Sequence, residues 1–139
     1  MPSSHTVRGV LVYPSDQFQP EDLLTFVEMR GFSDDWKRLG LDDDDLLGLQ
    51  VAIMADPRQP PVVPRTDGLR KIRFAPRRWN TGKRGAVRVC YVYFEEFGIV
   101  LLVVAYAKNE RDDLAEADRK AVRELIRRQK QAFAQRHFK

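Results

Sequence analysis

Two stretches of this chain combine a strand pattern with cations and a phenol. Residues 69–75 alternate as a β-strand does, which puts Lys71 and Arg73 on one face. Residues 99–107 form an apolar run with Tyr106 and Lys108 on one face at its end. If the fold brings these faces together, they line a shallow cationic groove that contains a phenol. Such a groove suits a polyanion, and could cleave one without histidine or a metal.

The chemistry open to such a groove is RNA cleavage by the 2′-hydroxyl. The protein must take a proton from that hydroxyl, stabilise the phosphorane and protonate the leaving 5′ oxygen. Arg and Lys can hold the nonbridging oxygens. Tyr106 or Lys108 can serve as base if nearby cations lower its pKa by about three units from about 10. So large a fall predicts weak activity on free RNA, which a larger assembly that fixes the substrate's geometry, such as the ribosome, could raise.

Other catalytic groups are less suitable. His5 and His137 lie near the two ends of the chain, so we expect no catalytic role for either. Cys90, the one cysteine, lies inside a strand pattern and is expected in the core of a protein from a reducing compartment. We expect neither a metal nor another cofactor.

Charge is distributed unevenly along the chain. Residues 57–94 hold ten Lys/Arg and one acid, whereas residues 16–56 hold three Lys/Arg and eleven acids. The basic block predicts attraction to phosphate backbones that weakens as salt rises. The alternative is a solvated basic surface without a partner.

The hydrophobic pattern predicts one α+β domain. We expect strands at 25–29, 69–75, 87–94 and 99–107. Helices are expected after Ser33 as N-cap, from Asp42 to Asp56, and after a capping box of Asp113 and Glu116. The last three strands should form an antiparallel meander, because their connections are short. Two N-terminal helices and one C-terminal helix then pack on this sheet, covering one face and leaving the other partly open.

Length and hydropathy set the domain boundaries and location. At 139 residues we expect a single domain at 24–139, preceded by an extension at 1–23 with at most one strand. No run reaches the roughly 18 apolar residues of a membrane span, and the N-terminus lacks a signal-peptide pattern. We therefore predict a cytoplasmic protein without a membrane contact.

The register of the 87–107 hairpin tests whether a groove can form. A four-residue turn at 95–98 puts Arg88 and Tyr106 on opposite faces of the sheet. An odd-length turn or a bulge, which Gly98 would allow, puts them on the same face. The groove hypothesis therefore predicts one of these two irregularities.

Three segments of the chain resemble a known family. They are GLRKIRF at 68–74, KRGAVRV at 83–89, and the stretch 101–114, which contains AYAKNE and ends in Asp113-Leu114. Their pattern is similar to the RelE/HigB-type toxins of bacterial type II toxin–antitoxin systems, with the HigB branch as the nearest match. The resemblance covers about residues 24–132 and is specific in 68–114.

The resemblance implies a RelE-like fold and an endoribonuclease that cuts mRNA on the ribosome and so inhibits translation. It also implies a cognate antitoxin, often one with a helix-turn-helix DNA-binding domain. The residues that match the family's basic and phenolic cleft, and so its candidate catalytic set, are Lys71, Arg73, Arg88, Tyr106 and Lys108. We further predict RNA binding by basic and aromatic groups of the strand and the loop after it: Arg70, Arg77, Arg78, Trp79, Lys83 and Arg84.

Each assignment has a structural alternative. Lys71 and Arg73 can be strand charges that discourage edge pairing. Tyr106 can be a core residue with a tethered hydroxyl, and Lys108 a surface charge. Arg88 can form an ion pair with Glu95, Glu96 or Glu110. Trp79 can pack under its own loop instead of stacking on a base.

Two other functions fit the same fold class. One is a binding module resembling the ParE toxins, which inhibit DNA gyrase and cut nothing. A set of cations around a phenol argues against it, because a gyrase inhibitor needs no phenol there. The other is a nucleic-acid-binding protein without toxicity.

Overall fold

The computed structural model describes residues 23–79, 85–110 and 114–137. Within these residues the chain forms four strands and three α-helices, in the order that the hydrophobic pattern predicts. Short 3-10 turns lie at Arg77–Trp79 and Glu95–Phe97. The elements are β1 (Thr25–Glu28), α1 (Arg30–Arg38), α2 (Asp43–Ala55), β2 (Leu69–Phe74), β3 (Val87–Phe94), β4 (Ile99–Ala107) and α3 (Glu116–His137).

The described strands form one sheet in the order β1-β4-β3-β2. β2, β3 and β4 are antiparallel neighbours, which confirms the predicted meander. β1 pairs with β4 in parallel, so the sheet is mixed rather than wholly antiparallel. The α+β class is therefore confirmed.

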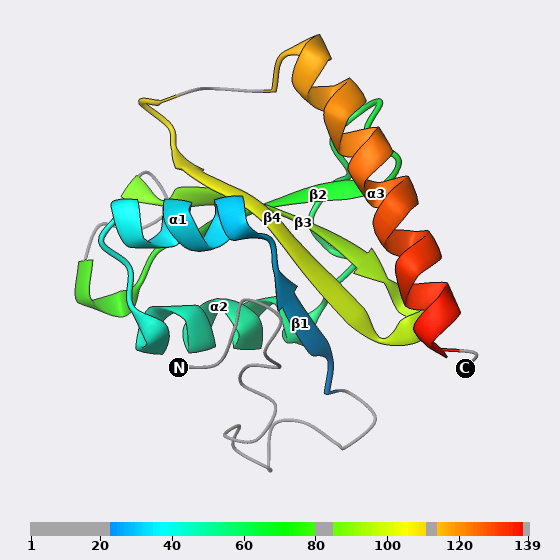
Figure 1. Cartoon of the computed structure of the whole chain (residues 1–139). Coiled ribbons are helices and arrows are strands. Elements are labelled where there is room, and N and C mark those ends of the chain that lie inside the picture. Colours follow the sequence, from blue (N-terminus) through cyan, green and yellow to red (C-terminus); the bar gives the residue numbers. More distant parts are fainter. Residues whose placement is uncertain (1–22, 80–84, 111–113, 138–139) are drawn as a thin grey trace.

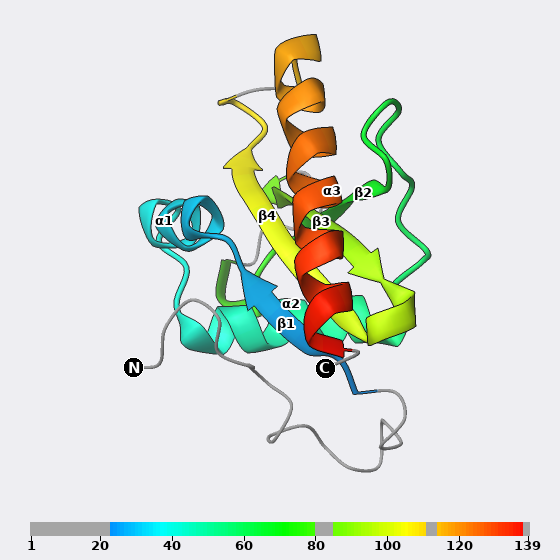
Figure 2. The same ribbon diagram turned by 45° about the vertical axis from the view of Figure 1, so that its right-hand side comes forward.

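Helices cover both faces of the sheet (Figures 1 and 2). α1 and α2 pack on one face with β3 residues such as Val89 and Tyr91. α3 packs on the other with Cys90 and Val92 of the same strand. The expectation that the helices cover only one face is wrong, because β3 and β4 are largely apolar on both faces and each face needs a covering layer. The α3 face stays open at its β2 edge, where Arg73 is exposed.

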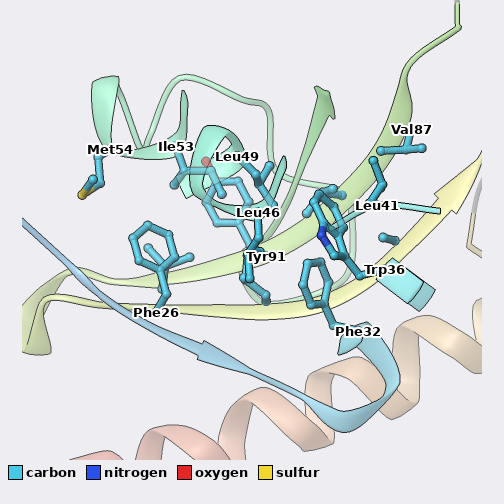
Figure 3. Close-up of a cluster of buried hydrophobic side chains, with 14 of the residues drawn as sticks. Phe26, Phe32, Trp36, Leu41, Leu46, Leu49, Ile53, Met54, Val87 and Tyr91 are labelled. Carbon is cyan, nitrogen blue, oxygen red and sulfur yellow. The ribbon is translucent and has the colours of Figure 1, made fainter. Parts of the chain in front are cut away.

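The core under α1 and α2 is built around aromatic rings (Figure 3). Phe32 and Trp36 of α1 stack with ring centroids 5.3 Å apart, and the Trp36 indole donates to the Asp42 carbonyl at 3.0 Å. Tyr91 of β3 lies in the same cluster and donates its hydroxyl to the Pro57 carbonyl at 2.7 Å. This core fixes both helices against the middle of the sheet.

Helix ends follow the local chemistry with one exception. Asp42 caps α2 in a capping box with Asp45, as its position at the helix start predicts. Ser33 does not cap α1, which begins earlier, after Met29; the Ser33 hydroxyl instead donates to Glu28 at 2.9 Å. Gly40, with φ 77°, follows the end of α1 in the left-handed region that glycine tolerates.

The proline-rich connector before β2 ties α3 to the sheet. Val63 donates to Leu69 at 2.7 Å, so the connector runs along the outer edge of β2. Arg119 and Arg123 of α3 donate to the connector carbonyls of Pro64 and Arg65, each at 2.6 Å. These bonds hold the first turns of α3 beside the start of β2.

Some predictions fall outside the described residues. They include residues 1–22 of the extension predicted at 1–23, where at most one strand was expected, the capping role of Asp113, and the tip of the basic loop at 80–84. Among the helices that are described, none has both the length and the apolar character needed to cross a membrane.

Candidate functional site

The β3–β4 hairpin contains the irregularity that the groove hypothesis requires. Its turn spans 95–98, and Gly98 closes it with φ 65°. Near the turn, Tyr91 pairs with Leu102; one step further, Cys90 pairs with Val104. One extra residue, Val103, therefore bulges out of β4. The predicted bulge is confirmed, but it lies at Val103 rather than at Gly98.

The bulge brings three candidate residues into one line across the sheet. Arg73 of β2 lies opposite Arg88 of β3, and Arg88 lies opposite Tyr106 of β4. Directly opposed side chains in antiparallel strands have Cβ atoms roughly 5 Å apart. We call Arg73, Arg88 and Tyr106 the three-strand row. Lys71 lies on the same face of β2, two residues before Arg73.

Burial increases along the three-strand row from β2 to β4. Arg73 is exposed and Lys71 is half-buried. Arg88 is 8% exposed and donates to the Ala86 carbonyl at 2.8 Å, and Tyr106 is 1% exposed. In this conformation a ligand can reach Arg73 and Lys71, whereas the Tyr106 ring lies in the core under α3.

The three-strand row carries an excess of positive charge. Among the described residues, no carboxylate forms an ion pair with Arg73 or Arg88. The three acids named as possible partners of Arg88 pair elsewhere: Glu95 with Arg58, Glu96 with Lys130, and Glu110 with Arg38. Like charges directly opposed in a sheet cost on the order of 0.2–1 kcal/mol. An anionic ligand would remove this cost, so the row has the electrostatics of an anion site.

Lys108 lies just beyond the end of β4, in a turn that starts at Ala107. It is exposed, and the turn closes with the Glu110 amide donating to the Ala107 carbonyl at 3.0 Å. Its ammonium group is therefore open to a ligand near the last residues of β4. Of the two candidate bases, Lys108 is the accessible one.

The predicted RNA-binding residues that the structure places lie on the α1/α2 side of the sheet, away from the three-strand row. Arg70 lies on the opposite face of β2 from Lys71. It donates to the carbonyls of Arg58 and Pro60 at 2.8 and 2.7 Å. Trp79 is half-buried against the core under α1 and α2, so its packing alternative is the one observed. Arg77 is exposed, and Lys83 and Arg84 lie outside the described residues.

Arg78 has a structural role at the start of α2. It forms an ion pair with buried Asp45 at 2.6 Å and donates to the Gly40 carbonyl at 2.9 Å. The hydrogen bond from Arg78 holds the pKa of Asp45 below its ordinary value, and in turn the carboxylate raises the pKa of Arg78. An RNA contact by Arg78 would compete with this pair.

Three side chains outside the predicted catalytic and RNA-binding sets border the three-strand row. Asp35, Arg38 and Glu110 bind the backbone of Ala105 and Ala107, on either side of Tyr106. Glu110 could have been found from its spacing, three residues after Ala107, which is typical of a capping carboxylate. No sequence signal links it to Arg38, which is 72 residues away.

No protein-family model matches the chain. Among the described residues, no group of three or more His, Cys, Asp or Glu is arranged to hold a metal ion. The geometry of the three-strand row and the motif resemblance are therefore the two indications of function.

Proposed function

We propose that this protein is the toxin of a type II toxin–antitoxin system, with a RelE-like fold, and that it cleaves mRNA on the ribosome. The observation that carries the proposal is the direct opposition of Arg73 and Arg88 beside Tyr106, with no described carboxylate paired to either arginine. A structural surface gains nothing from like charges in direct opposition, whereas a phosphodiester site needs them.

The accessible cations make the first contact with RNA. Arg73 and Lys71 bind the nonbridging phosphate oxygens, Arg73 in the bidentate geometry of a guanidinium. Arg88 adds positive charge from beneath and stabilises the phosphorane. No metal takes part in this scheme.

The general base is Lys108 or Tyr106. Lys108 is exposed, whereas Tyr106 must become accessible before its hydroxyl can touch a nucleotide. A phenol or an ammonium group is a poor base at neutral pH. The reaction should therefore be slow on free RNA and fast where the ribosome fixes the substrate geometry.

Burial of Tyr106 favours one alternative, a ParE-like gyrase inhibitor without nuclease activity. The argument against that function was the presence of a phenol among cations, and at 1% exposure the phenol is hidden in this conformation. The exposed Arg73 and Lys71 would then bind a protein or DNA surface without cutting it.

The proposal includes the partners that such a toxin requires. They are mRNA, the ribosome and a cognate antitoxin. The antitoxin would be a protein with a helix-turn-helix DNA-binding domain. The compartment is the cytoplasm, where translating ribosomes are found.

Induction in a bacterial host tests the proposal. Wild type is compared with Lys71→Ala/Arg73→Ala and with Lys37→Ala, which removes an exposed cation from α1 on the opposite face. We expect wild type and Lys37→Ala to arrest growth with cleaved transcripts, and the double variant to grow. Arrest with DNA damage would support the gyrase inhibitor instead. Normal growth of every strain would support the remaining function, a nucleic-acid-binding protein without toxicity.

A further inference from the structure

β4 extends well beyond its neighbour β1. The parallel pairing of the two strands ends at Leu102, whose carbonyl accepts from Met29 at 3.0 Å. Residues 103–107 continue the strand with no residue of β1 beside them. Backbone groups along such an edge need other partners, or they remain open to unwanted pairing.

Side chains take the place of the missing strand. The Ala105 amide donates to Asp35 Oδ2 at 3.0 Å, and Arg38 Nη2 donates to the Ala105 carbonyl at 3.4 Å. The Ala107 amide donates to Glu110 Oε1 at 2.8 Å. The bonded residues lie immediately before and after Tyr106, so the backbone is held on both sides of the phenol.

Arg38 links the two carboxylates into one network. Its guanidinium pairs with Asp35 at 3.2 Å and with Glu110. The side chains of Arg38 and Glu110 are 46% and 37% exposed, and exposed ion pairs contribute only about 0–1 kcal/mol to stability. The larger effect of the network is on where the end of β4 lies.

Glu110 also fixes the turn that carries Lys108. Its amide donates to the Ala107 carbonyl at 3.0 Å, while its carboxylate accepts from the Ala107 amide. Two hydrogen bonds between Ala107 and Glu110 therefore close the turn, and Lys108 is one of the residues between them.

We propose that Asp35, Arg38 and Glu110 are positioning residues that hold the end of β4, so that Tyr106 stays opposite Arg88 and Lys108 stays beside it. The consequence for catalysis rests on the proposed nuclease function. Misplacing a catalytic group by about 1 Å can cost about 100-fold in rate. Glu110→Ala removes both the acceptor of the Ala107 amide and one of the two carboxylate partners of Arg38.

The inference is tested on the full chain with three variants. Glu110→Ala loses the network. Glu110→Gln keeps an oxygen that accepts from the Ala107 amide and is the conservative rescue. Glu96→Ala is the matched control, because it removes an exposed acid whose ion pair, with Lys130, lies elsewhere. The readouts are amide hydrogen exchange at Ala105 and Ala107 and the kcat and KM of mRNA cleavage on ribosomes.

We expect at least about tenfold faster exchange at Ala107 in Glu110→Ala, where an open edge amide replaces a bonded one. We expect kcat to fall about 10- to 100-fold with KM within about twofold, since Glu110 makes no contact with RNA in this scheme. Glu110→Gln should keep slow exchange and most of the kcat, and Glu96→Ala should match wild type in both.

Unchanged exchange at Ala105 and Ala107 in Glu110→Ala would overturn the positioning role. A loss of kcat in Glu96→Ala equal to that in Glu110→Ala would also overturn it. If wild type cleaves no mRNA, the proposed nuclease fails, and the exchange comparison alone still decides whether the network holds the end of β4.

Discussion

Replacing Arg73 by Gln is expected to stabilise the protein while it removes the first phosphate contact. Two unit charges about 7 Å apart repel by about 0.6 kcal/mol in water and about 2.4 kcal/mol at an effective dielectric constant of about 20. Arg73 is exposed and Arg88 is buried, so the lower part of this range applies. We expect the free energy of unfolding to rise by about 0.5–1 kcal/mol, or about 2–3 °C in Tm for a chain of this length.

Urea unfolding followed by circular dichroism measures this gain. It should be largest at low ionic strength and shrink at about 0.5 M salt, where the Debye length is only about 4 Å. Arg127→Gln, which removes an exposed cation from α3, serves as the control and should shift stability by less than about 0.5 kcal/mol. If Arg73→Gln is less stable than wild type at low salt, or if Arg127→Gln gains as much, the reasoning about an anion site is refuted.

Three further results are expected. Deleting Val103 should remove the bulge and turn Tyr106 to the opposite face, so cleavage is lost and urea unfolding shifts to lower denaturant; a fully active deletion would contradict the register. Burial raises the pKa of Tyr91 to about 12, so stability should fall as pH rises from about 10 to 12, and Tyr91→Phe should flatten that dependence in urea titrations. Arg78→Ala should lower the urea midpoint of unfolding by leaving Asp45 buried without its cation. Since the lowered pKa of Asp45 stabilises the fold above about pH 4, this variant should also lose less stability on acidification than wild type does.

The strands could be predicted because their patterns are local. Alternation in 69–74 and the apolar run 99–107 were sufficient to place β2 and β4 and to make them parts of one meander. The same apolar run contained the information that both sheet faces are covered, since a strand buried on both sides needs a layer against each. Placing all three helices on one face overlooked this property of the run.

The three-strand row could be predicted only conditionally. Arg88 and Tyr106 share a face because of the bulge at Val103, and the run of valine and leucine around that position contains no glycine or other bulge signal. The length of the turn was enough to predict that a bulge is needed if Arg88 and Tyr106 share a face. It did not show that the bulge lies at Val103. Burial of Tyr106 depends on how α3 returns across the sheet, which local patterns do not encode.

Ion pairs between residues distant in sequence could not be predicted either, because local patterns do not encode tertiary packing. Arg78 was predicted to bind RNA because it lies in a basic loop, yet its carboxylate partner Asp45 lies in α2. Both residues belong to recognisable local motifs, a basic loop and a capping box. Only the three-dimensional structure shows that Arg78 of the basic loop forms an ion pair with Asp45 of the capping box.

Mapping the 5′ ends of transcripts after induction tests the central claim most directly. Wild type should produce cuts in frame within translated regions, and these cuts should disappear when translation is blocked. They should also be absent in Lys71→Ala/Arg73→Ala and present in Lys37→Ala. Growth arrest without such cuts, or cuts that persist in the double variant, would contradict cleavage by the three-strand row.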